Sequence, residues 1–192
     1  MSFINPHTKE INCKIVYYGP RLAGKSTNLR QILKKVSSDG RGEIPSLKEE
    51  GDESLHFDFL PLILGSIKGY KVRFHLYTLP DQPHLEASRK IILKGVDGVI
   101  FVADSRVDQL DRNIESWRNL VAHLAEFDLD IKMLPAVVQL NKRDLKAVIP
   151  VSEFKQLFQG IELTEGIAKE GTGVMETLQV VARKVLKGLK KE

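Results

Sequence analysis

Eight residues near the N-terminus have the types and spacing of a phosphate-binding loop. They are Gly19-Pro20-Arg21-Leu22-Ala23-Gly24-Lys25-Ser26, which fit the pattern G-x-x-x-x-G-K-[ST]. In such a loop, backbone N–H groups and the positive end of the following helix face an anion. We expect this loop and Thr27 to bind a nucleoside triphosphate, with Lys25 on the terminal phosphates and Ser26 on Mg²⁺.

The segments on either side of this loop have the periodicity that the site requires. Residues 11–18 form an apolar run that predicts a buried strand, and residues 26–36 carry apolar side chains at helical spacing. The other predicted elements are strands at 55–64, 70–77, 98–103 and 136–140, and helices at 110–127 and 173–186. This alternation predicts a doubly wound α/β domain that binds its ligands at the carboxyl ends of the strands.

A second motif follows the predicted strand 136–140. Asn141-Lys142-Arg143-Asp144 has the form N-K-x-D. The Asp144 carboxylate can accept from both N1–H and the exocyclic amine of guanine, whereas adenine has an acceptor at N1 and would leave a buried carboxylate unpaired. Lys142 can lay its stem across the base, and Asn141 can tie this motif to the phosphate loop. The two motifs together therefore predict a guanine-nucleotide site.

The pair Ala168-Lys169 precedes the last predicted helix. Guanine-nucleotide proteins place a backbone amide from such a loop on the guanine carbonyl. We therefore include both residues in the predicted base site. The alternative interpretation is an ordinary loop between a strand and a helix.

Composition and charge narrow the class of protein. The 192 residues carry a net charge of +4 and one cysteine, Cys13, so we expect one domain spanning 1–192, a reducing compartment and no disulfide framework. No apolar run reaches the length of a membrane span, and no signal peptide opens the sequence. Because residue 2 is serine and the last residues include no cysteine, we expect no lipid anchor. No aromatic-plus-basic pattern indicates nucleic acid. We expect a cytoplasmic protein.

The chain resembles the bacterial Ras-like small GTPases of the gliding-motility type, the MglA family. Besides the N-K-x-D motif, the resemblance is carried by residues 9–20, 57–62, 73–78, 87–90 and 93–105, and by Thr78 in place of an aspartate at the start of the third motif. It implies a Ras-like P-loop NTPase domain with a mixed, mainly parallel central sheet and helices on both faces. It also implies GTP, GDP and Mg²⁺ as ligands.

The same resemblance implies a role and partners. In that family, the GTP-bound state gathers effectors at one cell pole and sets the direction of movement, and a roadblock-type dimer of the MglB kind accelerates hydrolysis. The resemblance thus implies a polarity and motility switch enriched at a cell pole. Response-regulator-type or other polar effectors would bind the loops 37–54 and 78–88.

Several residues near the expected phosphates depart from the family pattern. Arg21 stands where the family loop has glycine, and Asp81 replaces a second glycine and adds negative charge near the γ-phosphate. Glu53 replaces an arginine that resembles an intrinsic finger. Gln82, which would orient the attacking water, now precedes Pro83, and this restricts its backbone.

Two interpretations of these changes remain open. In the first, Arg21 obstructs the transition state and hydrolysis is slow or absent. In the second, Arg21 supplies the catalytic cation from the phosphate loop, with Asp81 as its partner. Ser54 keeps a hydroxyl that can sense Mg²⁺ under either interpretation. The functional alternatives to a slow GTPase switch are a GTP-holding or nucleotide-independent scaffold for polar effectors, and another P-loop phosphotransferase or ATPase.

Overall fold

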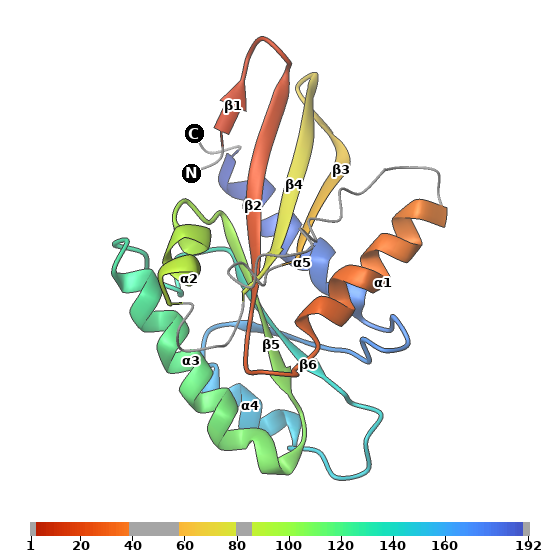
Figure 1. The fold of residues 1–192 in the computed structure, drawn as a ribbon, viewed down its shortest axis with the longest axis vertical. Helices are drawn as coiled ribbons and strands as arrows, with labels where there is room; N and C mark the ends of the chain where they lie inside the picture. The colour runs from red at the N-terminus through yellow and green to blue at the C-terminus, as the bar shows by residue number, and fades with distance from the viewer. Residues whose placement is uncertain (1–2, 39–57, 80–85, 190–192) are drawn as a thin grey trace, which may run out of the picture.

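Strands and helices alternate along the chain in a computed structural model that describes residues 3–38, 58–79 and 86–189 (Figure 1). The strands are β1 (Phe3–Asn5), β2 (Glu10–Tyr18), β3 (Phe59–Ile67), β4 (Tyr70–Thr78), β5 (Gly98–Asp104), β6 (Ala136–Asn141) and β7 (Glu162–Glu165). The helices are α1 (Lys25–Ser38), α2 (Glu86–Leu93), α3 (Leu110–Ala125), α4 (Val151–Leu157) and α5 (Val174–Leu189), with a 3-10 turn, η2, at Val107–Gln109. Within these ranges, no helix has both the length and the apolar character needed to cross a membrane.

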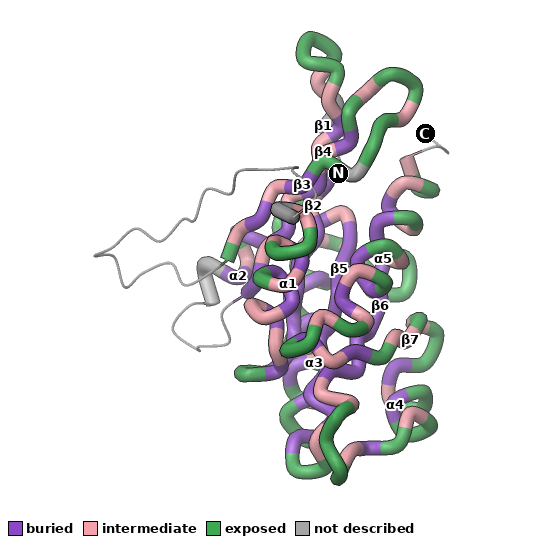
Figure 2. The backbone as a smooth tube through the Cα atoms, turned by 90° about the vertical axis from the view of Figure 1, so that its right-hand side faces the viewer, coloured by how far each residue is buried: buried purple, intermediate pink, exposed green. Residues whose placement is uncertain are grey.

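The described strands form one mixed, mainly parallel sheet, as predicted. Their order is β3-β4-β2-β5-β6-β7, and β1 pairs with β2 at one end. The pairs β1–β2 and β3–β4 are antiparallel, and the four other pairs are parallel. Every residue of β5 and β6 is buried, because helices cover both faces there (Figure 2). This double burial explains why both segments are continuous apolar runs in the sequence.

The two faces of the sheet have separate cores, with side chains of β2 alternating between them. Ile15 and Tyr17 pack with α1 and α5 on one face. Val16 and Tyr18 pack with α2, α3 and α4 on the other face. Cys13 is buried in the first core, and this burial raises the pKa of its thiol to about 12, so it acts as a small apolar residue.

Three predicted boundaries are wrong at the loops next to the site. Helix α1 continues to Ser38, so residues 37 and 38 of the predicted loop 37–54 are helical. Both ends of the predicted loop 78–88 belong to regular elements, because Thr78 ends β4 and residues 86–88 lie in α2. The eight residues of α2 and the seven of α4 span too few turns for a helical period to stand out in the sequence.

Candidate nucleotide site

The phosphate loop occupies residues 19–24, between the end of β2 and the first turn of α1. A Cβ atom at Gly19 would lie 2.2 Å from the carbonyl oxygen of Val102, so the loop passes directly over β5 at a point where only glycine fits. Leu22 has a left-handed backbone (φ 62°) and an exposed side chain. A non-glycine residue in this region is strained, and such strain is typical of ligand-binding loops.

The Lys25 ammonium is enclosed by this loop. It donates to the carbonyl oxygens of Gly19 (2.6 Å) and Pro20 (2.9 Å) and is buried. Ser26 and Thr27 follow in the first turn of α1 and are half-buried. A fixed cation beside a helix N-terminus makes this loop suited to bind an anion such as a phosphate group.

Asn141 connects the phosphate loop to the base site. It ends β6 and is buried, and its Nδ2 donates to the Ala23 carbonyl oxygen at 2.7 Å. Its Oδ1 accepts the backbone N–H of Ala168 at 2.8 Å. One side chain therefore joins three segments, and the predicted tie between the two motifs is confirmed. Contact of Ala168 or Lys169 with a guanine carbonyl stays a prediction.

Substitution of Gly24 should break this connection. Gly24 has φ 108°, and an added Cβ would lie 2.2 Å from Nδ2 of Asn141. We expect Gly24→Ala to weaken guanine-nucleotide binding by at least about tenfold, because the left-handed backbone is strained and Asn141 must move. Isothermal titration with GDP measures the effect. Gly160→Ala, also at positive φ but with nothing within 4 Å of the added Cβ, is the matched control. Equal affinities of these two variants would contradict the expectation.

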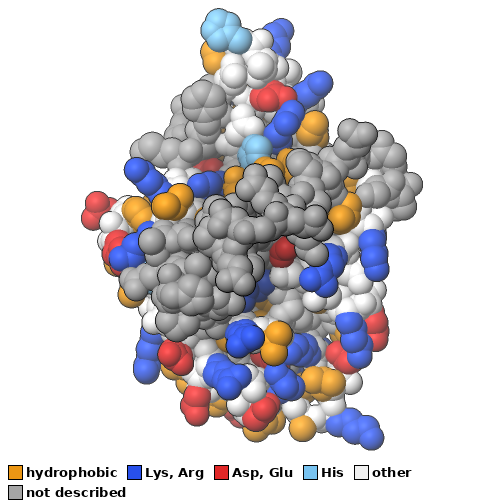
Figure 3. Space-filling model, in the orientation of Figure 1, with side chains coloured by type: hydrophobic (Ala, Val, Ile, Leu, Met, Phe, Trp, Pro, Cys, Tyr) orange, Lys and Arg blue, Asp and Glu red, His pale blue; other side chains and the backbone are white. Residues whose placement is uncertain are grey.

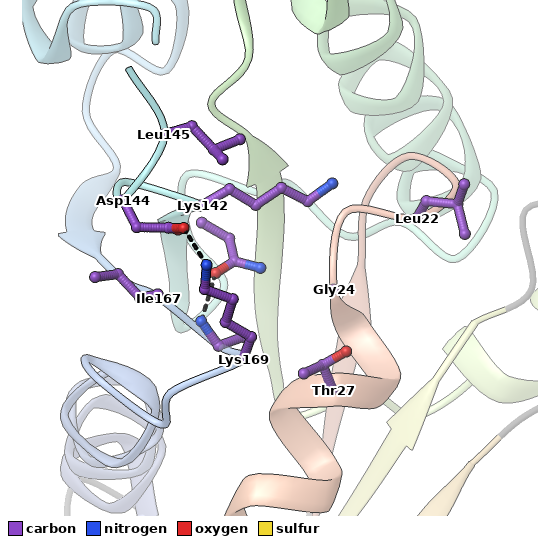
Figure 4. A pocket seen from close by; sticks show the side chains of 10 residues that line it. Leu22, Gly24, Thr27, Lys142, Asp144, Leu145, Ile167 and Lys169 are labelled. Atoms are coloured by element: carbon purple, nitrogen blue, oxygen red, sulfur yellow. Dashed lines mark hydrogen bonds and ion pairs between the residues drawn. The ribbon is translucent and has the colours of Figure 1, made fainter. Parts of the chain in front are cut away.

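A pocket of about 190 Å³ opens between these segments (Figure 4). It is lined from the phosphate loop and α1, from the N-K-x-D motif, and from the loop after β7. The lining residues are Leu22, Gly24, Thr27, Asn141, Lys142, Asp144, Leu145, Ile167, Ala168 and Lys169. The three segments that the sequence assigned to nucleotide binding thus meet around one pocket.

Asp144 presents an ionised carboxylate at this pocket. Its Oδ2 accepts a hydrogen bond from the Lys169 ammonium at 2.5 Å (Figure 4). This hydrogen bond holds the pKa of Asp144 below its usual value and raises the pKa of Lys169. An ionised carboxylate only accepts hydrogen bonds, as recognition of the guanine N1–H and amine requires.

Lys142 also lines the pocket, and its ammonium is held by a residue that the sequence did not reveal. Lys142 has a left-handed backbone (φ 67°), and its Nζ lies 2.6 Å from Oδ2 of Asp104 at the end of β5. Asp104 lies outside both the phosphate loop and the N-K-x-D motif. Only the parallel pairing of β5 with β6 brings it beside the N-K-x-D residues.

A second unpredicted carboxylate lies near the phosphate loop. Thr78 pairs with Tyr17 on β2, two residues before Gly19, so it lies at the carboxyl edge of the sheet. The backbone N–H of Asp58 donates to Oγ1 of Thr78 at 2.8 Å, and this hydroxyl donates to Oδ2 of Asp58 at 3.2 Å. Asp58 is exposed. A carboxylate therefore stands beside Thr78, the threonine that takes the place of an aspartate at the start of the third motif.

The remaining predicted residues divide into two groups. Arg21 lies on the phosphate loop with an exposed side chain. The predicted catalytic residue Gln82, the predicted ligand contact Asp81 and the predicted metal ligand Ser54 lie outside the described residues.

Comparison with known proteins identifies the family. No family model matches the chain. The chain is 51% identical to the mutual gliding-motility protein MglA of Myxococcus xanthus over 193 aligned positions, which cover 100% of this chain and 99% of that protein. The α/β fold, the mainly parallel sheet and the phosphate loop described above are those expected of a small GTPase. The chain therefore belongs to the MglA family of Ras-like small GTPases.

Proposed function

We propose that this protein is a guanine-nucleotide switch that regulates cell motility and polarity. The observation that carries the proposal is that the phosphate loop and the N-K-x-D motif, joined through Asn141, line the same pocket. Asp144 supplies base recognition, and Lys25 supplies charge for the phosphates. The motility role rests on the likeness to a mutual gliding-motility protein. In keeping with that role, we place the protein at a cell pole and assign it effectors there and a roadblock-type activating dimer.

The donor atoms near the phosphate loop suit Mg²⁺. P-loop proteins hold this ion with the loop Ser or Thr and with a carboxylate at the end of a neighbouring strand. Ser26 is the first of these donors. Asp58, held by Thr78, is the carboxylate at the corresponding edge. Mg²⁺ at such sites takes most of its ligands from phosphates and water, so few protein donors are needed. When bound, Mg²⁺ would neutralise phosphate charge.

Asp58→Asn should weaken the coupling between Mg²⁺ and nucleotide. The substitution keeps the side-chain shape but removes the charge, and loss of an outer ligand typically costs about 10- to 100-fold in metal affinity. The Mg²⁺ concentration that half-maximally slows GDP dissociation measures this coupling. The control is Glu162→Gln, which removes a carboxylate on β7 that pairs with Lys184 of α5. If GDP dissociation from Asp58→Asn depends on Mg²⁺ concentration as in the wild-type protein, Asp58 is not the carboxylate that holds Mg²⁺.

The proposed switch hydrolyses GTP slowly. Arg21 is a large exposed cation on the phosphate loop, at a position where a side chain competes with the attacking water. An arginine finger supplies roughly 10³- to 10⁵-fold in rate, and the corresponding family position here is Glu53. Slow intrinsic hydrolysis would leave the lifetime of the GTP-bound state to a partner protein.

Competition titration tests the nucleotide specificity. We expect unlabelled GTP and GDP with Mg²⁺ to displace a fluorescent GDP analogue, and ATP to displace it only at far higher concentration. Equal displacement by ATP would support a general P-loop phosphotransferase or ATPase. Failure of the analogue to bind would support a nucleotide-independent scaffold.

A further inference from the structure

We propose that Asp104 is a positioning residue for the guanine base and that it acts through Lys142. This inference rests on the guanine-nucleotide site proposed above and extends that site to a carboxylate outside both motifs. Asp104 does not line the pocket. Its role is to hold the Lys142 ammonium away from the base, so that the methylene stem of Lys142 forms one wall of the base site.

The Asp104 side chain is a buried and fully bonded anion. It is 1% exposed. Arg106 donates from Nε to Oδ1 (3.1 Å), from Nη2 to Oδ2 (2.8 Å) and from its backbone N–H to Oδ1 (3.2 Å), and Lys142 donates to Oδ2 (2.6 Å). Burial disfavours the charge, but these hydrogen bonds outweigh burial and hold the pKa of Asp104 below its usual value. Asp104 is therefore ionised at neutral pH.

The position of this carboxylate is set by the protein core. Asn113, buried in α3, accepts the backbone N–H of Asp104 at 3.0 Å and donates to its carbonyl oxygen at 2.8 Å. Next along the chain, the N–H of Ser105 donates to the carbonyl oxygen of Asn141 at 3.1 Å. Asp104 thus lies at a fixed point against the start of the base motif.

Lys142 takes its direction from this fixed point. Figure 4 shows the Lys142 stem running along the pocket toward the phosphate-loop side, while Asp144 points toward Lys169. With the ammonium bound to Asp104, the apolar methylenes remain to contact a planar base, an arrangement that long cationic side chains commonly adopt.

The charges around Asp104 explain why its loss would displace Lys142. Arg106 and Lys142 bind the same carboxylate oxygen, Oδ2. Without the negative charge between them, the two cations repel each other. Of these two cations only Lys142 lines the pocket, so its displacement would change the wall of the base site.

The test compares GDP dissociation from Asp104→Asn and Lys142→Met with that from the wild-type protein. We expect each variant to release a fluorescent GDP analogue about tenfold faster. In the Lys142→Met background, Asp104→Asn should have little further effect, because the ammonium is already absent. Competition by inorganic triphosphate, a probe of the phosphate loop alone, should stay at the wild-type level in Asp104→Asn. Glu162→Gln is the carboxylate control.

Each other result counts against the inference in a distinct way. Wild-type GDP dissociation from Asp104→Asn would overturn it, as would an undiminished effect of this substitution in the Lys142→Met background. If Asp104→Asn binds GDP and inorganic triphosphate equally weakly and has a lowered Tm, Asp104 stabilises the fold and does not position the base. If Asp104→Asn does not fold, the Lys142→Met variant tests the inference. GDP dissociation from Lys142→Met at the wild-type rate would then refute a role for the contact between Asp104 and Lys142. A wild-type protein that binds no GDP would refute the proposed function instead.

Discussion

Asp144→Ala should abolish the preference of this protein for guanine over adenine nucleotides. Asp144 places its carboxylate at the pocket, and the hydrogen bond from Lys169 holds the pKa of Asp144 below its usual value. Guanine offers two donors to this carboxylate, whereas adenine places an acceptor against it. A site built to hydrogen-bond a substrate can reject an analogue without that donor by roughly 10⁴- to 10⁵-fold. We therefore expect the ratio of GTP to ATP affinities to fall by about 10³-fold or more.

The measurement is competition of GTP and ATP against a fluorescent GDP analogue for both proteins. Glu165→Gln is a matched control, because this carboxylate pairs with Arg143 of the same motif at 2.8 Å but does not line the pocket. We expect the control to keep the wild-type affinity ratio. If Asp144→Ala keeps the wild-type ratio of GTP to ATP affinity, Asp144 does not recognise guanine in this pocket.

Arg21→Gly should accelerate hydrolysis of bound GTP by about tenfold or more. A tenfold change in rate corresponds to about 1.4 kcal/mol of activation free energy. Arg21 is an exposed side chain on the loop that holds Lys25. Glycine at this position leaves room for the attacking water beside the γ-phosphate. The acceleration would show that the native chain slows its own hydrolysis by obstruction.

Single-turnover hydrolysis after GTP loading separates the two interpretations of Arg21. If Arg21 instead supplies the catalytic cation, Arg21→Gly should slow turnover, by up to roughly 10³- to 10⁵-fold for a full arginine finger. Arg30→Ala removes an exposed cation from α1, beyond the loop, and controls for the change in charge. A slower Arg21→Gly protein would contradict obstruction.

The parts of the site that follow from local patterns were predictable from the sequence. The phosphate loop is a contiguous pattern with a strand before it and a helix after it, and β5 and β6 are apolar runs because both of their faces are covered. The role of Asn141 was predicted because its motif ends a strand parallel to β5, which brings it to the same sheet edge as the loop.

The parts that depend on tertiary contacts were not predictable. Asp104 meets Lys142 across 38 residues of sequence, and Asp58 meets Thr78 across 20. Neither carboxylate lies at a spacing typical of a motif, because strand pairing alone brings each to its partner. Helix α2 was missed for a different reason, since its eight residues carry too little periodicity.

The central claim is that this protein binds guanine nucleotide as a switch with slow hydrolysis. Chromatography of the nucleotide released at intervals after loading with GTP and Mg²⁺ tests it most directly. The account predicts that guanine nucleotide remains bound and that GTP converts to GDP only over hours. Recovery of no nucleotide from the loaded protein would contradict the claim and indicate a nucleotide-independent scaffold.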